Sequence, residues 1–153
     1  DLLWIAVNQS FEHFRDLSTI YEFGCGTGQY LFDLSQVYPD KDLVGTDWTE
    51  SSVALLGLMR AQGMRVQGTR FDFLKPEQGL KIASNAGVIT IGALEQVGPN
   101  FRPFLNYLLE QGPALVHSQR RSTAGRGQVV LAGARDQGPD RGAVVGAAQL
   151  HRQ

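Results

Sequence analysis

Apolar and polar positions alternate with two different periods along the first 117 residues. Short apolar runs rich in β-branched and aromatic residues are typical of strands, and apolar residues that recur every three or four positions are typical of helices. The pattern predicts strands near residues 19–23, 43–47, 87–91 and 114–117, a short one from residue 65, and helices near 1–17, 30–38, 53–59 and 103–111. Such alternation favours an α/β fold whose parallel sheet carries helices on both faces.

The first predicted strand runs into three alternating glycines, Gly24, Gly26 and Gly28, and we call residues 24–28 the glycine loop. Without a Cβ, glycine adopts positive φ readily and lets the backbone approach a ligand closely. The helix that follows would point its amino-terminal N–H groups at the loop. A dinucleotide fingerprint needs glycine at position 29, where Gln29 stands. The loop thus predicts a nucleoside site that fits NAD or FAD poorly; a purely structural glycine turn is the alternative.

The second predicted strand ends in a carboxylate, Asp47, about twenty residues after the glycines. The ribose of a bound nucleoside would lie there, and an ionised carboxylate can accept hydrogen bonds from both ribose hydroxyls. Asp47 could instead begin the turn into the next helix, but Thr49 and Ser51 are available as caps, which leaves Asp47 for a ligand. The neighbouring Trp48 either stacks on an adenine or fills the core.

The order acidic, any, Gly, any, Gly, any, Gly from Glu22 to Gly28 resembles the first motif of the class I S-adenosylmethionine-dependent methyltransferases. The resemblance covers about residues 1–117. It implies a three-layer Rossmann-like sandwich with a mainly parallel sheet, and S-adenosylmethionine as the cofactor. In this scheme Glu22 holds the amino group of the methionine moiety. The residues implied to surround the cofactor are Glu22, Gly24, Cys25, Gly26, Thr27, Gly28, Asp47, Trp48, Asp72, Phe73 and Gly92.

Two further segments gain a role only through the resemblance. It implies that Asp72 meets the adenine amino group and that Phe73 flanks the ring; without the family, Asp72 is equally well explained as a turn residue. Gly92, just past the fourth strand, would lie where methyl donor and acceptor meet. Glu95 is the titratable group of that segment, and it either orients or deprotonates an acceptor, or is simply solvated. The sequence assigns no catalytic residue.

Composition agrees with one globular domain: 42% of the 153 residues are hydrophobic and 19% are charged. Cys25 is the single cysteine, which excludes an internal disulfide and a multi-cysteine metal site, and the three histidines lack metal-ligand spacing, so no metal is expected. No apolar run approaches the roughly 20 residues of a membrane span, and the first residues do not resemble a signal peptide. We therefore expect a cytoplasmic protein without a membrane partner.

The character of the chain changes at Ser118, so we divide it into a methyltransferase core, residues 1–117, that is incomplete, and an atypical tail, residues 118–153. The tail holds six arginines, no lysine and no aromatic residue. Three explanations compete: a disordered arm that binds RNA or an acidic partner, a poor edge of the fold with short strands at residues 129–131 and 144–145, and a shifted reading frame near His117. We prefer the frame shift, which translation of the coding DNA in its other frames would decide.

The expected reaction is methyl transfer from S-adenosylmethionine to an acceptor that the sequence does not identify. The core carries 8 basic and 13 acidic residues, a net charge of −5, and the tail 6 and 2, a net charge of +4. An acidic core argues against a nucleic-acid groove, so we expect a small-molecule acceptor; nucleic acid stays possible for the basic tail. The usual C-terminal strands of a seven-stranded sheet are expected to be absent or replaced. A non-catalytic S-adenosylmethionine- or nucleoside-binding domain is the alternative.

Overall fold

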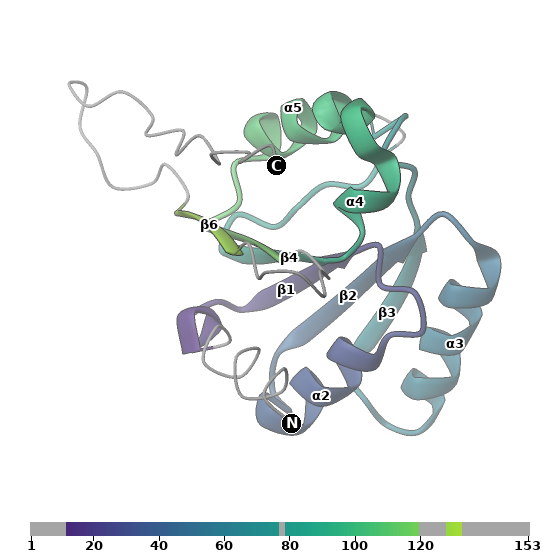
Figure 1. Ribbon diagram of the computed structural model, residues 1–153. Helices are drawn as coiled ribbons and strands as arrows, with labels where there is room; N and C mark the ends of the chain where they lie inside the picture. Colours follow the sequence, from purple (N-terminus) through teal and green to yellow (C-terminus); the bar gives the residue numbers. More distant parts are fainter. Residues whose placement is uncertain (1–11, 77–78, 120–127, 133–153) are drawn as a thin grey trace.

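A computed structural model describes residues 12–76, 79–119 and 128–132 of the chain. These residues form a six-stranded sheet in the order β3-β2-β1-β4-β5-β6, with helices on both faces (Figure 1). The strands are β1 (Thr19–Phe23), β2 (Asp42–Asp47), β3 (Val66–Arg70), β4 (Ala86–Ile91), β5 (Leu115–Gln119) and β6 (Gln128–Ala132). The helices are α2 (Gln29–Val37), α3 (Glu50–Ala61), α4 (Leu94–Val97) and α5 (Arg102–Gln111), with short 3-10 segments η1 (Glu12–Phe14) and η2 (Gly98–Phe101).

The predicted α/β alternation is confirmed, and neighbouring strands from β3 to β5 pair in parallel. β1 lies at the centre, between β2 and β4. The carboxyl ends of these three strands therefore meet at one edge of the sheet, which we call the carboxyl edge. Every residue of β4 is buried, as expected of a strand covered on both faces.

The two faces of the sheet bury separate apolar clusters. Ile20 of β1 packs with Leu31 of α2 and Leu56 of α3, whereas Phe23 packs on the opposite face with Phe71 and Phe104. The Phe23 ring lies 4.8 Å from Phe71 and 5.0 Å from Phe104, centroid to centroid. Such aromatic pairs contribute about 0.5–1.5 kcal/mol each beyond the area that they bury. Both layers thus hold β1 rigidly just before the glycine loop.

The predicted helix over residues 1–17 is wrong in the part that the structure describes, since only Glu12–Phe14 is helical, as one 3-10 turn. The turn closes where the Leu17 amide donates to the Phe14 carbonyl. Phe14 is fully buried and lies against Gly87, where a Cβ would clash with its ring. Burial of this aromatic on β4 holds the chain there instead of a continued helix. Residues 1–11 lie outside the described residues.

At the other end of the sheet, β5 runs to Gln119, two residues past the predicted boundary of the core. β6 pairs with it in antiparallel register, Gln119 opposite Gln128 and Leu115 opposite Ala132. This strand coincides with the short strand at residues 129–131 that one explanation of the tail expects. Residues 133–153, with the second expected strand, lie outside the described residues. The frame shift stays a hypothesis.

Among the described residues, no helix has the length and apolar character needed to cross a bilayer.

The burial of His117 predicts a pH-dependent stability. Its side chain is buried in β5, and desolvation, together with the nearby His13, lowers the pKa of His117 below its ordinary 6.5, against a smaller opposing effect of Gln119. Below pH 6.5 the imidazole of His117 is protonated in the unfolded chain but stays neutral in the folded chain, so the free energy of unfolding decreases as the pH falls. We expect the free energy of unfolding to drop by up to about 1.4 kcal/mol per pH unit in this range.

Urea denaturation of the wild type and of His117→Gln between pH 5 and 8, roughly the range over which histidine titrates, measures this dependence. The variant should have the flatter profile whatever its overall stability. Equal slopes in the two proteins would contradict the assignment of the pH dependence to His117.

Candidate functional site

The glycine loop connects β1 to α2 at the carboxyl edge and adopts the predicted backbone conformation. The φ angles of Gly24, Gly26 and Gly28 are 75°, 53° and 74°. Only glycine adopts such angles without strain. The predicted positive φ values are therefore confirmed.

The three glycines serve different purposes. A Cβ at Gly24 would clash with Ala93, and one at Gly28 would lie 2.6 Å from the Leu56 side chain, so these two positions let the loop pack against the protein. A Cβ at Gly26 would meet nothing within 4 Å. Gly26 is thus the position where a side chain would enter open space beside the loop.

Most of the amides of the glycine loop itself donate hydrogen bonds within the protein. The Gly24 and Cys25 amides donate to the Thr46 carbonyl at 2.8 and 2.9 Å, and the Gly28 amide donates to the Cys25 carbonyl at 2.8 Å. The Gly26 amide donates to Asp47 Oδ2 at 3.0 Å. A phosphate cradle needs such amides to point at its ligand. These four bonds hold the loop in shape, and none of these four amides is open to a phosphate.

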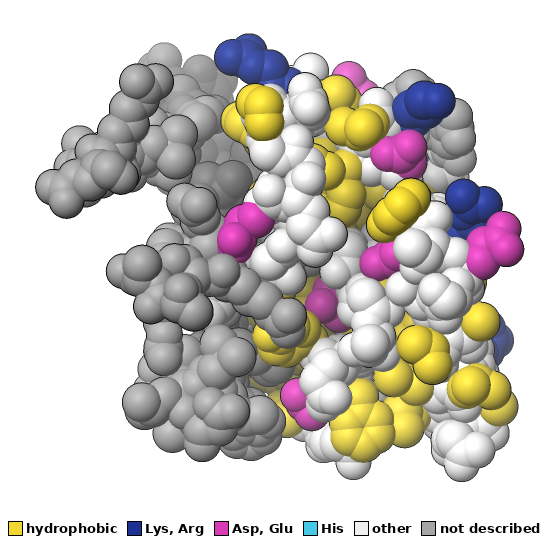
Figure 2. Space-filling view, turned by 45° about the vertical axis from the view of Figure 1, so that its right-hand side comes forward, with side chains coloured by type: hydrophobic (Ala, Val, Ile, Leu, Met, Phe, Trp, Pro, Cys, Tyr) yellow, Lys and Arg dark blue, Asp and Glu magenta, His cyan; other side chains and the backbone are white. Residues whose placement is uncertain are grey.

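The surroundings of the loop are acidic. Glu22 is 1% exposed and Asp47 is 8% exposed, and their charges, after desolvation, help to raise the pKa of the Cys25 thiol to about 12. Arg70 pairs with Asp47 in the sheet register, but its guanidinium binds Glu50 at 3.2 Å. Figure 2 turns this side of the molecule forward, with acidic side chains across its middle and Lys and Arg nearer its margins. Two buried carboxylates favour a cationic ligand and disfavour a phosphate.

Asp47 takes the turn role that the sequence analysis treats as the alternative to ligand binding. Thr49 is the N-cap of α3, as predicted, since its side chain accepts a hydrogen bond from the Ser52 amide. Yet Asp47 Oδ1 also accepts from the Thr49 amide and the Thr49 hydroxyl, both at 2.9 Å. Asp47 therefore takes part in the turn into α3, and the expectation that capping leaves it wholly to a ligand is wrong.

The candidate adenine residues lie at the same edge with different surroundings. Trp48 is 70% exposed, which rules out the core-filling alternative and leaves its ring accessible. Phe73 packs edge-to-face on Phe104 at 4.4 Å and lies beside Gly24, as the short distance from a Cβ placed there indicates. Asp72 is exposed and accepts the Leu74 amide at 2.8 Å, so it forms the turn that residue preference alone suggests.

The end of β4 completes the neighbourhood of the loop. Gly92 has a φ of 69°, and its amide donates to the Gln119 carbonyl at 2.9 Å. Ala93 is buried against Gly24, whereas Thr27 and Glu95 are exposed. The structure thus brings the predicted residues from β1, β2 and β4 to one edge, and the side chain of Glu95 is exposed there.

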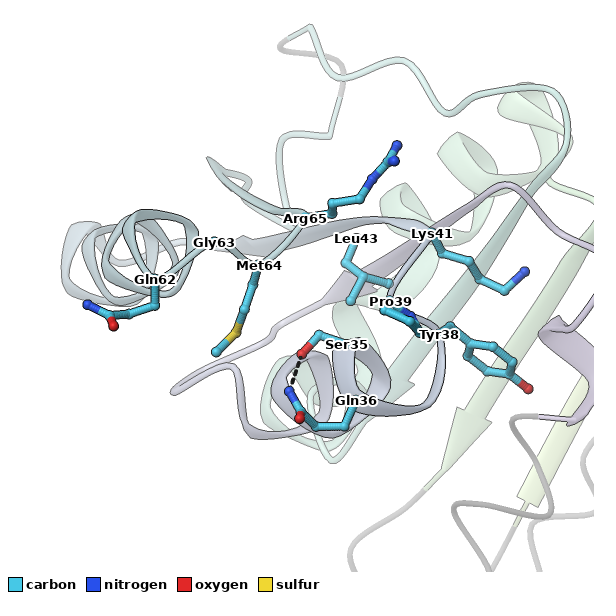
Figure 3. Close-up of a pocket in the computed structure, with 10 residues that line it drawn as sticks. All are labelled: Ser35, Gln36, Tyr38, Pro39, Lys41, Leu43, Gln62, Gly63, Met64 and Arg65. Carbon is cyan, nitrogen blue, oxygen red and sulfur yellow. Dashed lines mark hydrogen bonds between the residues drawn. The ribbon is translucent and has the colours of Figure 1, made fainter.

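A separate hollow of about 350 Å³ lies at the opposite end of the strands, between the carboxyl ends of α2 and α3 (Figure 3). Its basic side chains are engaged elsewhere: Lys41 donates to the carbonyls of Arg15 and Leu17 at 2.6 Å, and Arg65 binds Asp42 at 2.6 Å. The hollow is distant from the loop, and no charged group is aimed into it in a way that selects a ligand.

Sequence reasoning missed two contributors to the site. The Thr46 carbonyl, which binds two loop amides, carries no side-chain signal and could not have been found. The contact of Asp47 with Thr49 could have been found, because an aspartate two residues before a helix cap favours a side-chain bond to the backbone two positions on. Among the described residues, no group of three His, Cys, Asp or Glu side chains is arranged to hold a metal ion.

No protein-family model matches the chain, and no curated protein matches it in sequence. Many solved structures do match its fold. The methyltransferase domain of the bacterial protein CtHen1 superposes with a TM-score of 0.66 at 14% identity, over 78% of this chain and 66% of that one. Coclaurine N-methyltransferase bound to N-methylheliamine and SAH gives a TM-score of 0.61 at 15% identity, over 76% of this chain and 35% of that one.

PKMT2 from Rickettsia typhi in complex with AdoHcy gives a TM-score of 0.56 at 16% identity, over 68% of this chain and 21% of that one. The chain has the class I methyltransferase fold over part of its length, as the glycine motif predicts. It spans less than two thirds of the length of these three structures.

The environment of Cys25 predicts an inert thiol. Desolvation and the charges of Glu22 and Asp47 raise its pKa from 9.0 to about 12, so near pH 8 the thiolate fraction should be about a thousandfold below that of a free thiol. Because Cys25 is the single cysteine, alkylation by iodoacetamide followed by mass spectrometry reports on it alone. We expect slow labelling in buffer and fast labelling in urea. Labelling of the folded chain at the rate of free cysteine would contradict the described environment.

Proposed function

We propose that this chain binds S-adenosylmethionine at the carboxyl edge and forms the cofactor-binding part of a methyltransferase. One observation carries the proposal: the glycine loop is held by Thr46 and Asp47 and is flanked by the buried carboxylates of Glu22 and Asp47. A ligand that carries positive charge and no phosphate suits such a site. The sulfonium and ammonium groups of S-adenosylmethionine meet both conditions, whereas NAD and FAD bring a pyrophosphate.

Each residue near the loop has a chemical reason for its proposed part. Glu22, buried in β1 just before the loop, is the counter-charge of the ammonium group, because a buried cation needs a negative partner. Asp47 accepts from the ribose. The exposed ring of Trp48 and the edge of Phe73 offer apolar contact to the adenine, and Asp72 keeps a second carboxylate oxygen for its amino group. Gly26 leaves the open space that the ligand occupies.

Methyl transfer requires few catalytic side chains. When bound, S-adenosylmethionine supplies a methyl group that its sulfonium already makes electrophilic. The residues of this chain then bind and orient it, and alignment of two reactants can lower a barrier by roughly 7–11 kcal/mol. Gly92 and Ala93 follow the end of β4, where Ala93 lies beside Gly24, and would border the acceptor. We assign no general base.

The acceptor is proposed to be a small molecule, because the core carries a net charge of −5, from 8 basic and 13 acidic residues, and would repel a phosphate backbone. Binding without turnover is the second candidate. This candidate is favoured because the match covers 66% or less of the length of the three structures above. In those proteins, residues that complete an acceptor site can lie in the part that has no counterpart here.

Calorimetric titration tests the proposed ligand class. Because the site holds buried carboxylates and self-bound amides, we expect S-adenosylmethionine and S-adenosylhomocysteine to bind and NAD to bind much more weakly or not at all. Tighter binding of NAD would contradict the proposal. Transfer of a labelled methyl group to a panel of small acceptors then separates an enzyme from a binder.

Substitution of Gly26 tests the location of the site. In Gly26→Ala the new methyl group enters the open space beside the loop, so the affinity for S-adenosylhomocysteine should fall at least tenfold, roughly 1.4 kcal/mol. Gly112→Ala is the matched control: its φ of 58° is close to the 53° of Gly26, its Cβ would also meet nothing, and it lies at the end of α5 away from the loop.

Both variants should lose a similar stability of about 1 kcal/mol, because alanine is strained at these angles. Only Gly26→Ala should lose affinity. Normal binding by Gly26→Ala would mean that the ligand lies elsewhere.

A further inference from the structure

Three of the acceptor positions of the Asp47 carboxylate are already filled by the protein. Oδ2 accepts from the Gly26 amide at 3.0 Å, and Oδ1 accepts from the amide and the hydroxyl of Thr49, both at 2.9 Å. An ionised carboxylate offers about four lone-pair positions, two on each oxygen. Oδ1 is therefore saturated, and one position remains, on Oδ2.

The hydroxyl of Thr49 is itself fixed by Ser52. The two hydroxyl oxygens lie 2.8 Å apart, and the Ser52 amide lies 3.4 Å from Thr49 Oγ1. Because an ionised carboxylate only accepts, the single proton of Thr49 must point at Asp47, and the Ser52 hydroxyl must donate to Thr49. Ser52 is buried, so water competes little for these bonds. The three residues form a chain of donors that ends on Asp47.

We propose that Thr49 is a positioning residue that locks Asp47, so that a bound sugar is held through one hydroxyl, on Oδ2, and not through two. The inference rests on the proposed function, because it concerns how the same site holds its nucleoside. It limits the expectation that Asp47 accepts from both ribose hydroxyls. It also gives the turn into α3 a part in ligand binding beyond helix capping.

The lock couples two loops that are distant in the sequence. Gly26 in the glycine loop and Thr49 before α3 bind opposite oxygens of one carboxylate. Removing the Thr49 hydroxyl frees one side of Oδ1 and lets the carboxylate rotate, which should also loosen the bond from the Gly26 amide. The weakening of the Gly26 hydrogen bond should therefore be detectable at the Gly26 amide in the absence of any ligand.

The first measurement uses the ligand-free protein. Hydrogen exchange at the Gly26 amide is compared in the wild type, Thr49→Val and Thr49→Ser. Valine keeps the branched shape and removes the hydroxyl, and serine keeps the hydroxyl. We expect faster exchange of Gly26 in Thr49→Val and near wild-type exchange in Thr49→Ser. Unchanged exchange in Thr49→Val would overturn the lock.

The second measurement is the affinity for S-adenosylhomocysteine. Thr49→Val and Ser52→Ala should bind about tenfold more weakly, as expected for a weakened charge-assisted hydrogen bond, and Thr49→Ser should restore binding. Adding Thr49→Val to Asp47→Ala should cost nothing further, because Thr49 acts through Asp47. Ser35→Ala is the matched control: it removes a buried hydroxyl that donates to the Phe32 carbonyl at 2.6 Å in α2, with no contact to Asp47.

The third measurement compares S-adenosylhomocysteine with analogues that lack the 2′- or the 3′-hydroxyl. One analogue should bind clearly more weakly to the wild type and the other about as well as the parent. The inference would be overturned if both analogues lost affinity equally or if neither lost any. It would also be overturned if Thr49→Val still weakened binding in the Asp47→Ala background. A wild-type chain that binds no S-adenosylhomocysteine would overturn the proposed function instead, while the exchange of Gly26 would still report on the lock.

Discussion

The site depends on one backbone oxygen, the carbonyl of Thr46, which accepts two hydrogen bonds from the glycine loop. Through it the amides of Gly24 and Cys25 fasten the loop to β2. The loop can come so close only because positions 24 and 28 lack side chains, whose Cβ atoms would collide with Ala93 and Leu56. The attached loop begins just after the buried Glu22 and reaches Asp47 through the amide of Gly26. The attachment of the loop to β2 thus brings its backbone close to the acidic side chains of the site.

The parts of the fold that the sequence predicts well are those dominated by local chemistry. The apolar run of β4, the glycines with positive φ and the helix between Pro103 and Gly112 are fixed by preferences that neighbouring residues express. The predicted helix at the amino end fails in its described part because a distant partner decides it. Phe14 is drawn onto Gly87, some seventy residues away in the chain, and local periodicity contains no trace of that contact.

In the candidate site, too, some features can be predicted from the sequence and others cannot. Which residue types gather at the carboxyl edge follows from the order of strands and from the motif that begins at Glu22. Which bonds they make does not follow, because the amides of the loop have two possible kinds of partner, a ligand or the protein itself. The geometry assigns four of them to the protein. For the same reason the sequence does not show that the carboxylate of Asp47 takes part in the turn into α3.

The position of β1 between β2 and β4 has an evolutionary consequence. The chain leaves β1 toward one side of the sheet to build β2 and β3, and returns on the other side to build β4 and β5, so the loops after β2 and β4 diverge from the glycine loop in opposite directions. In the function that we propose, the segment after β2 would hold the nucleoside, and the part of the segment after β4 beyond Ala93 would border the acceptor. Substitutions there could then alter the choice of acceptor without touching the residues proposed to hold the nucleoside.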